Sequence, residues 1–74
     1  MLGEKIKNYL IEHGIKQRFL AEKLELPDPV ISDMLNGQRK IDAVEYYQIC
    51  KALRVSLEYF FVNELVENWY EFTS

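Results

Sequence analysis

The stretch from residue 17 to residue 37 constrains the fold of this chain more than any other. Both prolines of the sequence lie within residues 27–29, and an Asn-Gly pair follows at residues 36–37. Proline is tolerated in the first turn of an α-helix and glycine is favoured just after the last turn, so residues 28–35 are predicted to form one short helix. The apolar residues of the preceding segment also recur at helical spacing. The pattern therefore predicts two short helices, about 16–24 and 28–35, joined by a tight turn.

The rest of the chain also has the spacing of helices. Apolar residues recur every three or four positions from residue 2 to residue 13, and Gly14 is a typical helix end. Asp42 and Glu45 form a capping-box pattern at the start of a fourth helix, and Ser56 can cap a fifth. No segment alternates apolar and polar residues as a half-buried strand does. The predicted fold class is all-α, a compact bundle of five helices.

The size of the chain limits how it can be stabilised. With 74 residues it has room for one domain, and a core of this size contributes only about 3–5 kcal/mol of net stability. One cysteine and one histidine exclude an internal disulfide and a structural zinc site, which leaves self-association as the way to add stability. The sequence has no signal-peptide pattern and no apolar run of about 20 residues, so we expect a cytoplasmic protein without a membrane partner.

The net charge of −3 is unevenly distributed. Residues 1–55 contain nine Lys and Arg against eight Asp and Glu, whereas residues 56–74 contain four Glu and no basic residue. An acidic protein is a poor match for a polyanion, but most of the excess negative charge belongs to the C-terminal segment. A locally positive surface elsewhere is therefore compatible with the composition.

Three segments of the chain match a known pattern. They are GEKIKNYLIEHGIKQRFLAEKL, ISDMLNGQRK and YYQICKALRVSLEYFF, in this order. Gln17 opens the second helix of the pattern, LAEKL follows at residues 20–24, and Asn36-Gly37 closes the third helix. Residues 3–61 thereby resemble the Cro/C1-type (XRE) helix-turn-helix family, and most of all its short regulators from phages and mobile elements of Gram-positive bacteria. In such a motif two short helices cross at a steep angle, and the second is presented to a DNA groove.

The resemblance implies a compact lambda-repressor-like domain over residues 1–62. An apolar and acidic extension over residues 63–74 is expected to continue helix five. The resemblance also implies a homodimer that binds double-stranded DNA, with the helix at about 28–35 in the major groove. Glu25 and Arg54 occupy positions that are often glycine in the family. A non-glycine residue in the left-handed conformation costs about 1 kcal/mol, so the turn can differ locally here.

Polar side chains flank the predicted recognition helix where the family contacts the DNA backbone. Phosphate contacts dominate the affinity of such proteins and fix their register on the duplex. Arg18 is explained equally well as an exposed surface residue without a role in DNA binding. Asn36 is explained equally well as the residue that ends its helix. The resemblance places backbone contacts at Gln17, Arg18, Asn36, Gln38, Arg39 and Lys40.

The start of the recognition helix has prolines and aspartates where the family usually has polar or basic residues. Asp28 and Asp33 can accept a hydrogen bond from cytosine N4, and Val30 can contact a thymine methyl group. Ser32 can bond to a base or a phosphate, or simply pack. Asp28 is expected first to cap its own helix with the same carboxylate, and Pro29 to occupy the first helical position. The candidate base-reading residues are Asp28, Val30, Ser32 and Asp33.

The C-terminal segment has more large apolar side chains than a loose tail needs. Aromatic residues are favoured at the centres of protein interfaces. We expect the segment to form a dimer interface; the alternative is that it completes the core of its own chain. The residues concerned are Leu65, Val66, Trp69, Tyr70 and Phe72.

No arrangement of catalytic residues is apparent. The three glycines are scattered, the serines lack a neighbouring base, and no two metal-ligating side chains have the spacing of a site. We therefore expect no enzyme activity, no cofactor, no metal and no small-molecule ligand.

Three functions remain. The first is a sequence-specific transcription regulator, homodimeric and associated with the nucleoid, whose partner is double-stranded DNA. The second is a protein-interaction module that has kept the fold and lost DNA binding, which the aspartates and the negative charge favour. The third is an antitoxin-like component that does both. The amide and basic side chains at residue 17 and residues 38–40 favour the first.

Overall fold

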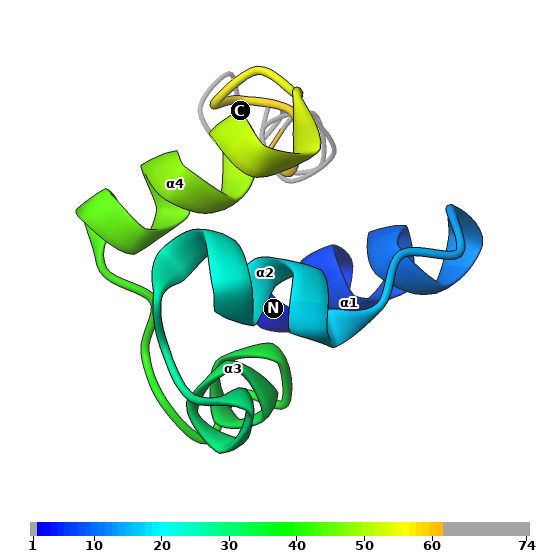
Figure 1. The fold of residues 1–74 in the computed structure, drawn as a ribbon. Coiled ribbons are helices and arrows are strands. Elements are labelled where there is room, and N and C mark those ends of the chain that lie inside the picture. The colour runs from blue at the N-terminus through cyan, green and yellow to red at the C-terminus, as the bar shows by residue number, and fades with distance from the viewer. Residues whose placement is uncertain (1, 62–74) are drawn as a thin grey trace.

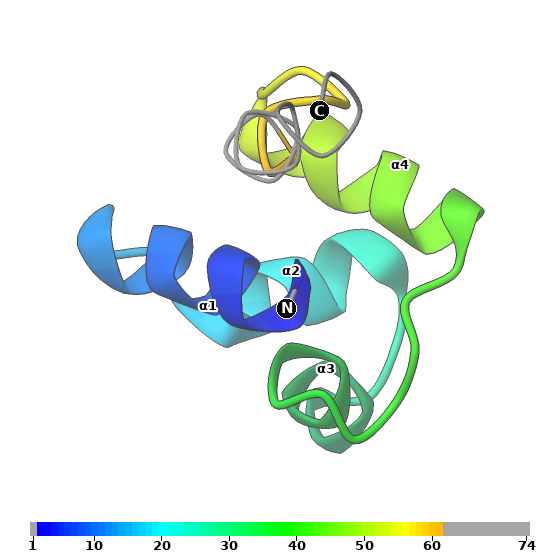
Figure 2. The ribbon, with the colours of Figure 1, turned by 180° about the vertical axis from the view of Figure 1, so that it is seen from behind.

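The computed structural model describes residues 2–61, and this part of the chain contains four helices and no strand (Figure 1). The helices are α1 (Leu2–Glu12), α2 (Gln17–Leu24), α3 (Asp28–Leu35) and α4 (Ala43–Leu53). α2 lies between α3 and α4 and packs against both, and α1 packs against α3 (Figure 1 and Figure 2). The all-α bundle predicted from the sequence is confirmed.

The fifth helix predicted from Ser56 is not present among residues 2–61. Residues 57–61 form turns instead, in which the Tyr59 amide donates to the Ser56 carbonyl over 3.1 Å. These turns direct Phe60 into the core, where it is 6% exposed. Residues from 62 onward, including the predicted extension, lie outside the described part of the chain.

One apolar core is shared by the four helices. Its members recur at three- and four-residue spacing along each helix, which is the pattern that predicted them. Cys50 belongs to this core, and burial raises the pKa of its thiol, as expected of a small apolar side chain rather than a reactive one. The buried residues are Ile6, Leu10, Leu20, Ala21, Leu24, Ile31, Met34, Leu35, Ile49, Cys50, Leu53 and Phe60.

All four helices end with the same hydrogen-bond pattern. In each case an amide just past the helix donates to the carbonyl five residues earlier, over 2.8–3.0 Å. This is the Schellman motif, which requires a left-handed residue immediately before that amide. The left-handed residues are Gly14, Glu25, Gly37 and Arg54, with φ of 63°, 56°, 78° and 59°. Glu25 and Arg54 therefore keep the turn that glycine usually makes, in spite of its conformational cost.

Replacing Glu25 with glycine is expected to stabilise the fold. Glycine adopts positive φ without the steric cost, so the free energy of unfolding in urea should rise by up to about 1 kcal/mol. Glu22→Gly removes the same charge from within α2 and is the matched control; it should lower the free energy by about 1 kcal/mol. If both variants lose stability equally, Glu25 is not held in the left-handed conformation. Arg54→Gly should behave as Glu25→Gly does.

At Gly3, α1 lies very close to the end of α3. Gly3 is buried, and a Cβ atom at this position would overlap the carbonyl oxygen of Met34 and lie 3.1 Å from that of Leu35. The contact is therefore between one backbone and the other. α1 can pack this closely against α3 because residue 3 has no side chain.

Candidate nucleic-acid interface

α2, residues 25–27 and α3 form a helix-turn-helix unit. The turn closes when the Leu26 amide donates to the Ala21 carbonyl over 3.0 Å, immediately after left-handed Glu25. Ala21 is 6% exposed on the buried face of α2. A larger side chain at residue 21 would push apart elements that are packed closely, which explains why this residue is small.

α3 spans Asp28–Leu35, the range predicted from the sequence, but its N-cap residue lies one position earlier than expected. Pro27 is its N-cap residue, Asp28 is already helical, and no side chain caps this end. The prediction that Asp28 caps the helix is therefore wrong, and Pro29 does not occupy the first helical position. The amides of Val30 and Ile31 both donate to the Pro27 carbonyl, over 3.0 and 3.2 Å, and Pro29 has no N–H. The start of α3 thus offers a ligand few backbone donors.

The outer face of α3 is acidic and carries no basic residue. Asp28 and Asp33 are exposed, and Val30 and Ser32 are half-buried. The Asp33 carboxylate makes no hydrogen bond to any residue between 2 and 61. This side chain is free to accept a hydrogen bond from a base-edge donor such as cytosine N4.

The starts of α2 and α3 are joined by an ion pair. Arg18 Nη2 lies 3.8 Å from Asp28 Oδ2, and the two side chains are 75% and 49% exposed. Such an exposed pair contributes little to stability, so Arg18 can exchange Asp28 for another anion. Gln17, the first residue of α2, is half-buried beside it. The structure therefore brings Gln17, Arg18 and Asp28 to one edge of the helix-turn-helix unit.

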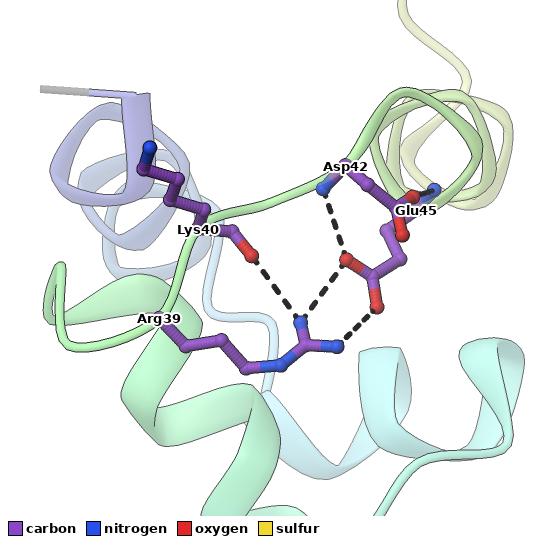
Figure 3. Close-up of polar contacts among 4 residues, drawn as sticks. All are labelled: Arg39, Lys40, Asp42 and Glu45. Carbon is purple, nitrogen blue, oxygen red and sulfur yellow. Dashed lines mark hydrogen bonds and ion pairs between the residues drawn. The ribbon is translucent and has the colours of Figure 1, made fainter.

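The loop between α3 and α4 is anchored by Arg39. Its Nη1 and Nη2 atoms donate to the two carboxylate oxygens of Glu45, over 3.0 and 2.8 Å (Figure 3). Glu45 Oε1 also accepts from the Asp42 amide (3.0 Å), and Asp42 Oδ1 accepts from the Glu45 amide (2.8 Å). These last two bonds confirm the predicted capping box at the start of α4. We call Arg39, Asp42 and Glu45 the Arg39 clasp.

The charges of the clasp depend on one another. The hydrogen bond from Arg39 lowers the pKa of Glu45, although desolvation opposes it, and the same bond raises the pKa of Arg39. Glu45 is 9% exposed, and an ionised carboxylate with so little access to water needs a counter-charge. Arg39 supplies that charge, whereas the side chain of Lys40 points away from the clasp (Figure 3). Gln38 and Lys40 are exposed on the same loop.

A lysine of α1 also reaches this surface. Lys7 Nζ donates to Asn36 Oδ1 over 2.9 Å, and Asn36 Nδ2 donates to Ser32 Oγ over 3.3 Å. Asn36 therefore ends α3, as predicted, and also links it to α1. Lys7 was not among the predicted site residues, because no local pattern in the sequence relates residue 7 to residue 36. Only the crossing of α1 and α3 brings them together.

Other kinds of site are not apparent in the described part of the chain. Within residues 2–61 no three His, Cys, Asp or Glu side chains gather as metal ligands. None of the helices in that range is both long and apolar enough to cross a membrane. The predicted dimer-interface residues Leu65, Val66, Trp69, Tyr70 and Phe72 lie outside it.

Comparison with known proteins agrees with this geometry. A family model described as Helix-turn-helix matches residues 6–60 of the 74. No curated protein and no solved structure matches the chain. The matched range contains α2, the turn, α3 and α4, together with most of α1. The chain therefore belongs to the Cro/C1-type (XRE) helix-turn-helix family of DNA-binding regulators.

Proposed function

We propose that this chain is a homodimeric transcription regulator of the short phage type, and that α3 enters the major groove of its operator. Membership of the family supports DNA binding in general. One observation carries the finer proposal: exposed side-chain donors precede α3 at the start of α2 and follow it on the loop, and Arg18 of α2 lies 3.8 Å from Asp28 of α3. A helix that reads bases requires donors of this kind for the phosphates on either side of the groove.

The DNA backbone is proposed to be held from both ends of α3. Arg18 and Gln17 act at the start of α2, and Lys40 and Gln38 act on the loop. Their cationic and amide groups also offset the repulsion between phosphates and the two aspartates of α3. The proposed contacts are Lys7, Gln17, Arg18, Asn36, Gln38 and Lys40.

Arg39 is assigned a role different from the phosphate contact expected from the sequence. Both of its Nη atoms donate to Glu45, and Glu45 has little access to water. A phosphate could recruit Arg39 only by leaving Glu45 without its counter-charge. We therefore infer that Arg39 holds the loop on which Lys40 and Gln38 are presented.

Base reading is proposed to rely on acceptors and apolar groups. Asp33 is proposed to accept from cytosine N4, and Val30 to contact a thymine methyl group. Asp28 shares its carboxylate with Arg18, and Ser32 already accepts from Asn36, so both are proposed as weaker contributors. This readout predicts operators with C·G pairs opposite Asp33.

A dimer is part of the proposal because one such helix gives little specificity alone. Two copies related by a two-fold axis would read half-sites about one turn of DNA apart. The extension over residues 63–74 is proposed as the interface, through Leu65, Val66, Trp69, Tyr70 and Phe72. A regulator of this kind would act in the cytoplasm, associated with the nucleoid.

Selection of bound duplexes from a random DNA pool tests the proposal. We expect a two-fold-related sequence, and an affinity that falls steeply with salt, with a logarithmic slope of about −0.9 for each phosphate contacted. Lys40→Ala should weaken binding to all sequences and reduce the slope by about one phosphate, whereas Asp33→Ala should change the preferred base. Glu12→Ala, at the end of α1, is the control and should change neither. A chain that selects no sequence would refute the proposal.

A protein-interaction module remains the second candidate. The observation that favours it is the outer face of α3, with two exposed carboxylates and no cation. A partner protein with a basic groove would suit that face as well as DNA does. If the fully folded chain binds no duplex at any salt concentration, the protein-interaction module is favoured over the DNA-binding regulator.

A further inference from the structure

A groove with an apolar floor lies between α2 and α4. It consists of two adjoining cavities of about 490 and 340 Å³, which share Phe19 and Ala52. Ile15 and Leu53 complete the apolar floor of the smaller cavity. We call this surface the α2–α4 groove. None of the proposed DNA contacts lines it.

The rim of the groove is basic. Lys16, Lys23, Lys51 and Arg54 line the two cavities, and all four side chains are exposed. None of them makes an ion pair with another residue of the described range. Lys23 Nζ lies 5.6 Å from the centre of the Phe19 ring, so a positive charge is held directly above the apolar floor. Four of the nine basic residues of the chain are thus concentrated here, without an ion-pair partner among residues 2–61.

An exposed apolar strip on α4 extends the groove. Val44 and Tyr47 are 66% and 52% exposed, and Lys51 follows one turn later on the same face. Gln48, which lines the groove, lies four residues after Val44 and therefore adjoins it on that face. Apolar surface rimmed by charge is typical of a protein-binding site.

We propose that the α2–α4 groove binds residues 62–74 of a second copy of this chain. That segment contains Glu64, Glu67 and Glu71 and no basic residue, which complements the basic rim. It also contains large apolar residues at the spacing with which a helix fills an apolar groove. These residues are Leu65, Trp69 and Phe72, at positions i, i+4 and i+7.

The position at which the described chain ends favours the second copy over the same copy. Phe61 packs beside Tyr46, with ring centres 5.3 Å apart. Gln48 and Ala52 lie two and six residues beyond Tyr46, which in a helix of 3.6 residues per turn places them on another side of α4. A segment leaving Phe61 would have to pass around α4 to reach its own groove. In the proposed two-fold dimer each segment would bind the groove of the partner, and every contact would occur twice.

Reversal of charge on each side of the contact tests the proposal without DNA. The groove variant is Lys23→Glu with Lys51→Glu, and the tail variant is Glu67→Lys with Glu71→Lys. Sedimentation over a range of concentrations should show a dimer for the unmodified chain. Each variant alone should dissociate at least tenfold more readily, because like charges then face each other in both halves of the dimer. An equimolar mixture of the two variants should regain the dimer, since each segment then meets a groove of opposite charge.

The control is Glu4→Lys with Glu12→Lys, which has the same net charge as the tail variant and alters only exposed residues of α1. It should dimerise as the unmodified chain does, and circular dichroism should give all variants the same helix content. The proposal is overturned by an unmodified chain that stays monomeric, by variants that keep its dissociation constant, or by a mixture that does not associate. A folded chain that dimerises in this way and selects no DNA would refute the proposed function alone.

Discussion

Gly3→Ala is expected to destabilise the protein, although alanine is the better helix former by about 1 kcal/mol. The added Cβ would overlap the carbonyl oxygen of Met34 and lie 3.1 Å from that of Leu35. Both are backbone atoms at the end of α3, so neither can rotate away, and α1 must move instead. Overpacking of this kind costs about 1–3 kcal/mol, which is a large part of the about 3–5 kcal/mol available to a domain of this size. The midpoint of urea unfolding measures the loss.

Gly14→Ala is the matched comparison. Gly14 is left-handed, with φ of 63°, and a Cβ there would meet nothing within 4 Å. Its cost is conformational only, about 1 kcal/mol, and Gly14→Asn should recover part of it because asparagine tolerates that conformation. At residue 3 the cost should instead grow with side-chain size, from Gly3→Ala to Gly3→Ser. A Gly3→Ala variant as stable as the unmodified chain would mean that α1 does not contact α3 in this way.

The contrast between these glycines indicates what can be predicted from the sequence alone. The end of α1 at Gly14, the end of α3 at Gly37 and the capping box of Asp42 and Glu45 each depend on residues within one helical turn. Local conformational preferences decide such features, and all of them were predicted. The core followed from helical spacing for the same reason.

The start of α3 is an informative error. An N-cap residue needs an extended backbone, and Pro27 already has one, with φ of −61° and ψ of 148°. Asp28 therefore falls inside the helix, and its carboxylate lies near Arg18 instead of capping α3. Aspartate is a favoured N-cap residue and proline is not, and this preference predicted the wrong residue here.

Contacts between helices could not be predicted. Nothing near residue 3 indicates that Met34 lies against it, and nothing near residue 7 indicates Asn36. The partner of Arg39 is six residues away, across a loop whose path depends on how α3 and α4 pack. The basic loop was therefore interpreted as a single phosphate-binding unit, whereas its cations have different surroundings.

Glu45→Gln is expected to weaken DNA binding although residue 45 is not proposed to contact DNA. Glutamine retains an oxygen for the Asp42 amide, so the capping box can persist. In the unmodified chain the two Nη atoms of Arg39 donate to the two carboxylate oxygens of Glu45. Glutamine has only one side-chain oxygen, so it cannot accept both of these hydrogen bonds. The loop that carries Lys40 then loses its anchor, and the affinity for all duplexes should fall several-fold. Fluorescence anisotropy with the selected operator measures the change.

Arg39→Met should weaken binding at least as much as Glu45→Gln, because it also leaves the Glu45 carboxylate without its counter-charge, and the double variant should be no worse than Arg39→Met. Residues of one hydrogen-bonded network give such non-additive losses. Lys40→Ala provides the contrast, because the loss of DNA affinity that it causes should add to the loss caused by Glu45→Gln. The salt slope distinguishes the roles further: Lys40→Ala should reduce it by about one phosphate, and Arg39→Met should leave it unchanged.

Acid should remove the contribution of the clasp to stability. The bond from Arg39 lowers the pKa of Glu45 from its ordinary value of 4.5, so the folded chain binds this proton less readily than the unfolded chain. The resulting stability is complete at neutral pH and is lost as the pH falls below 4.5 through the lowered value. The difference in unfolding free energy between the unmodified chain and Glu45→Gln should therefore shrink in acid.

If Arg39→Met instead lowers the salt slope while Glu45→Gln leaves DNA affinity intact, Arg39 contacts phosphate and the loop does not depend on the clasp.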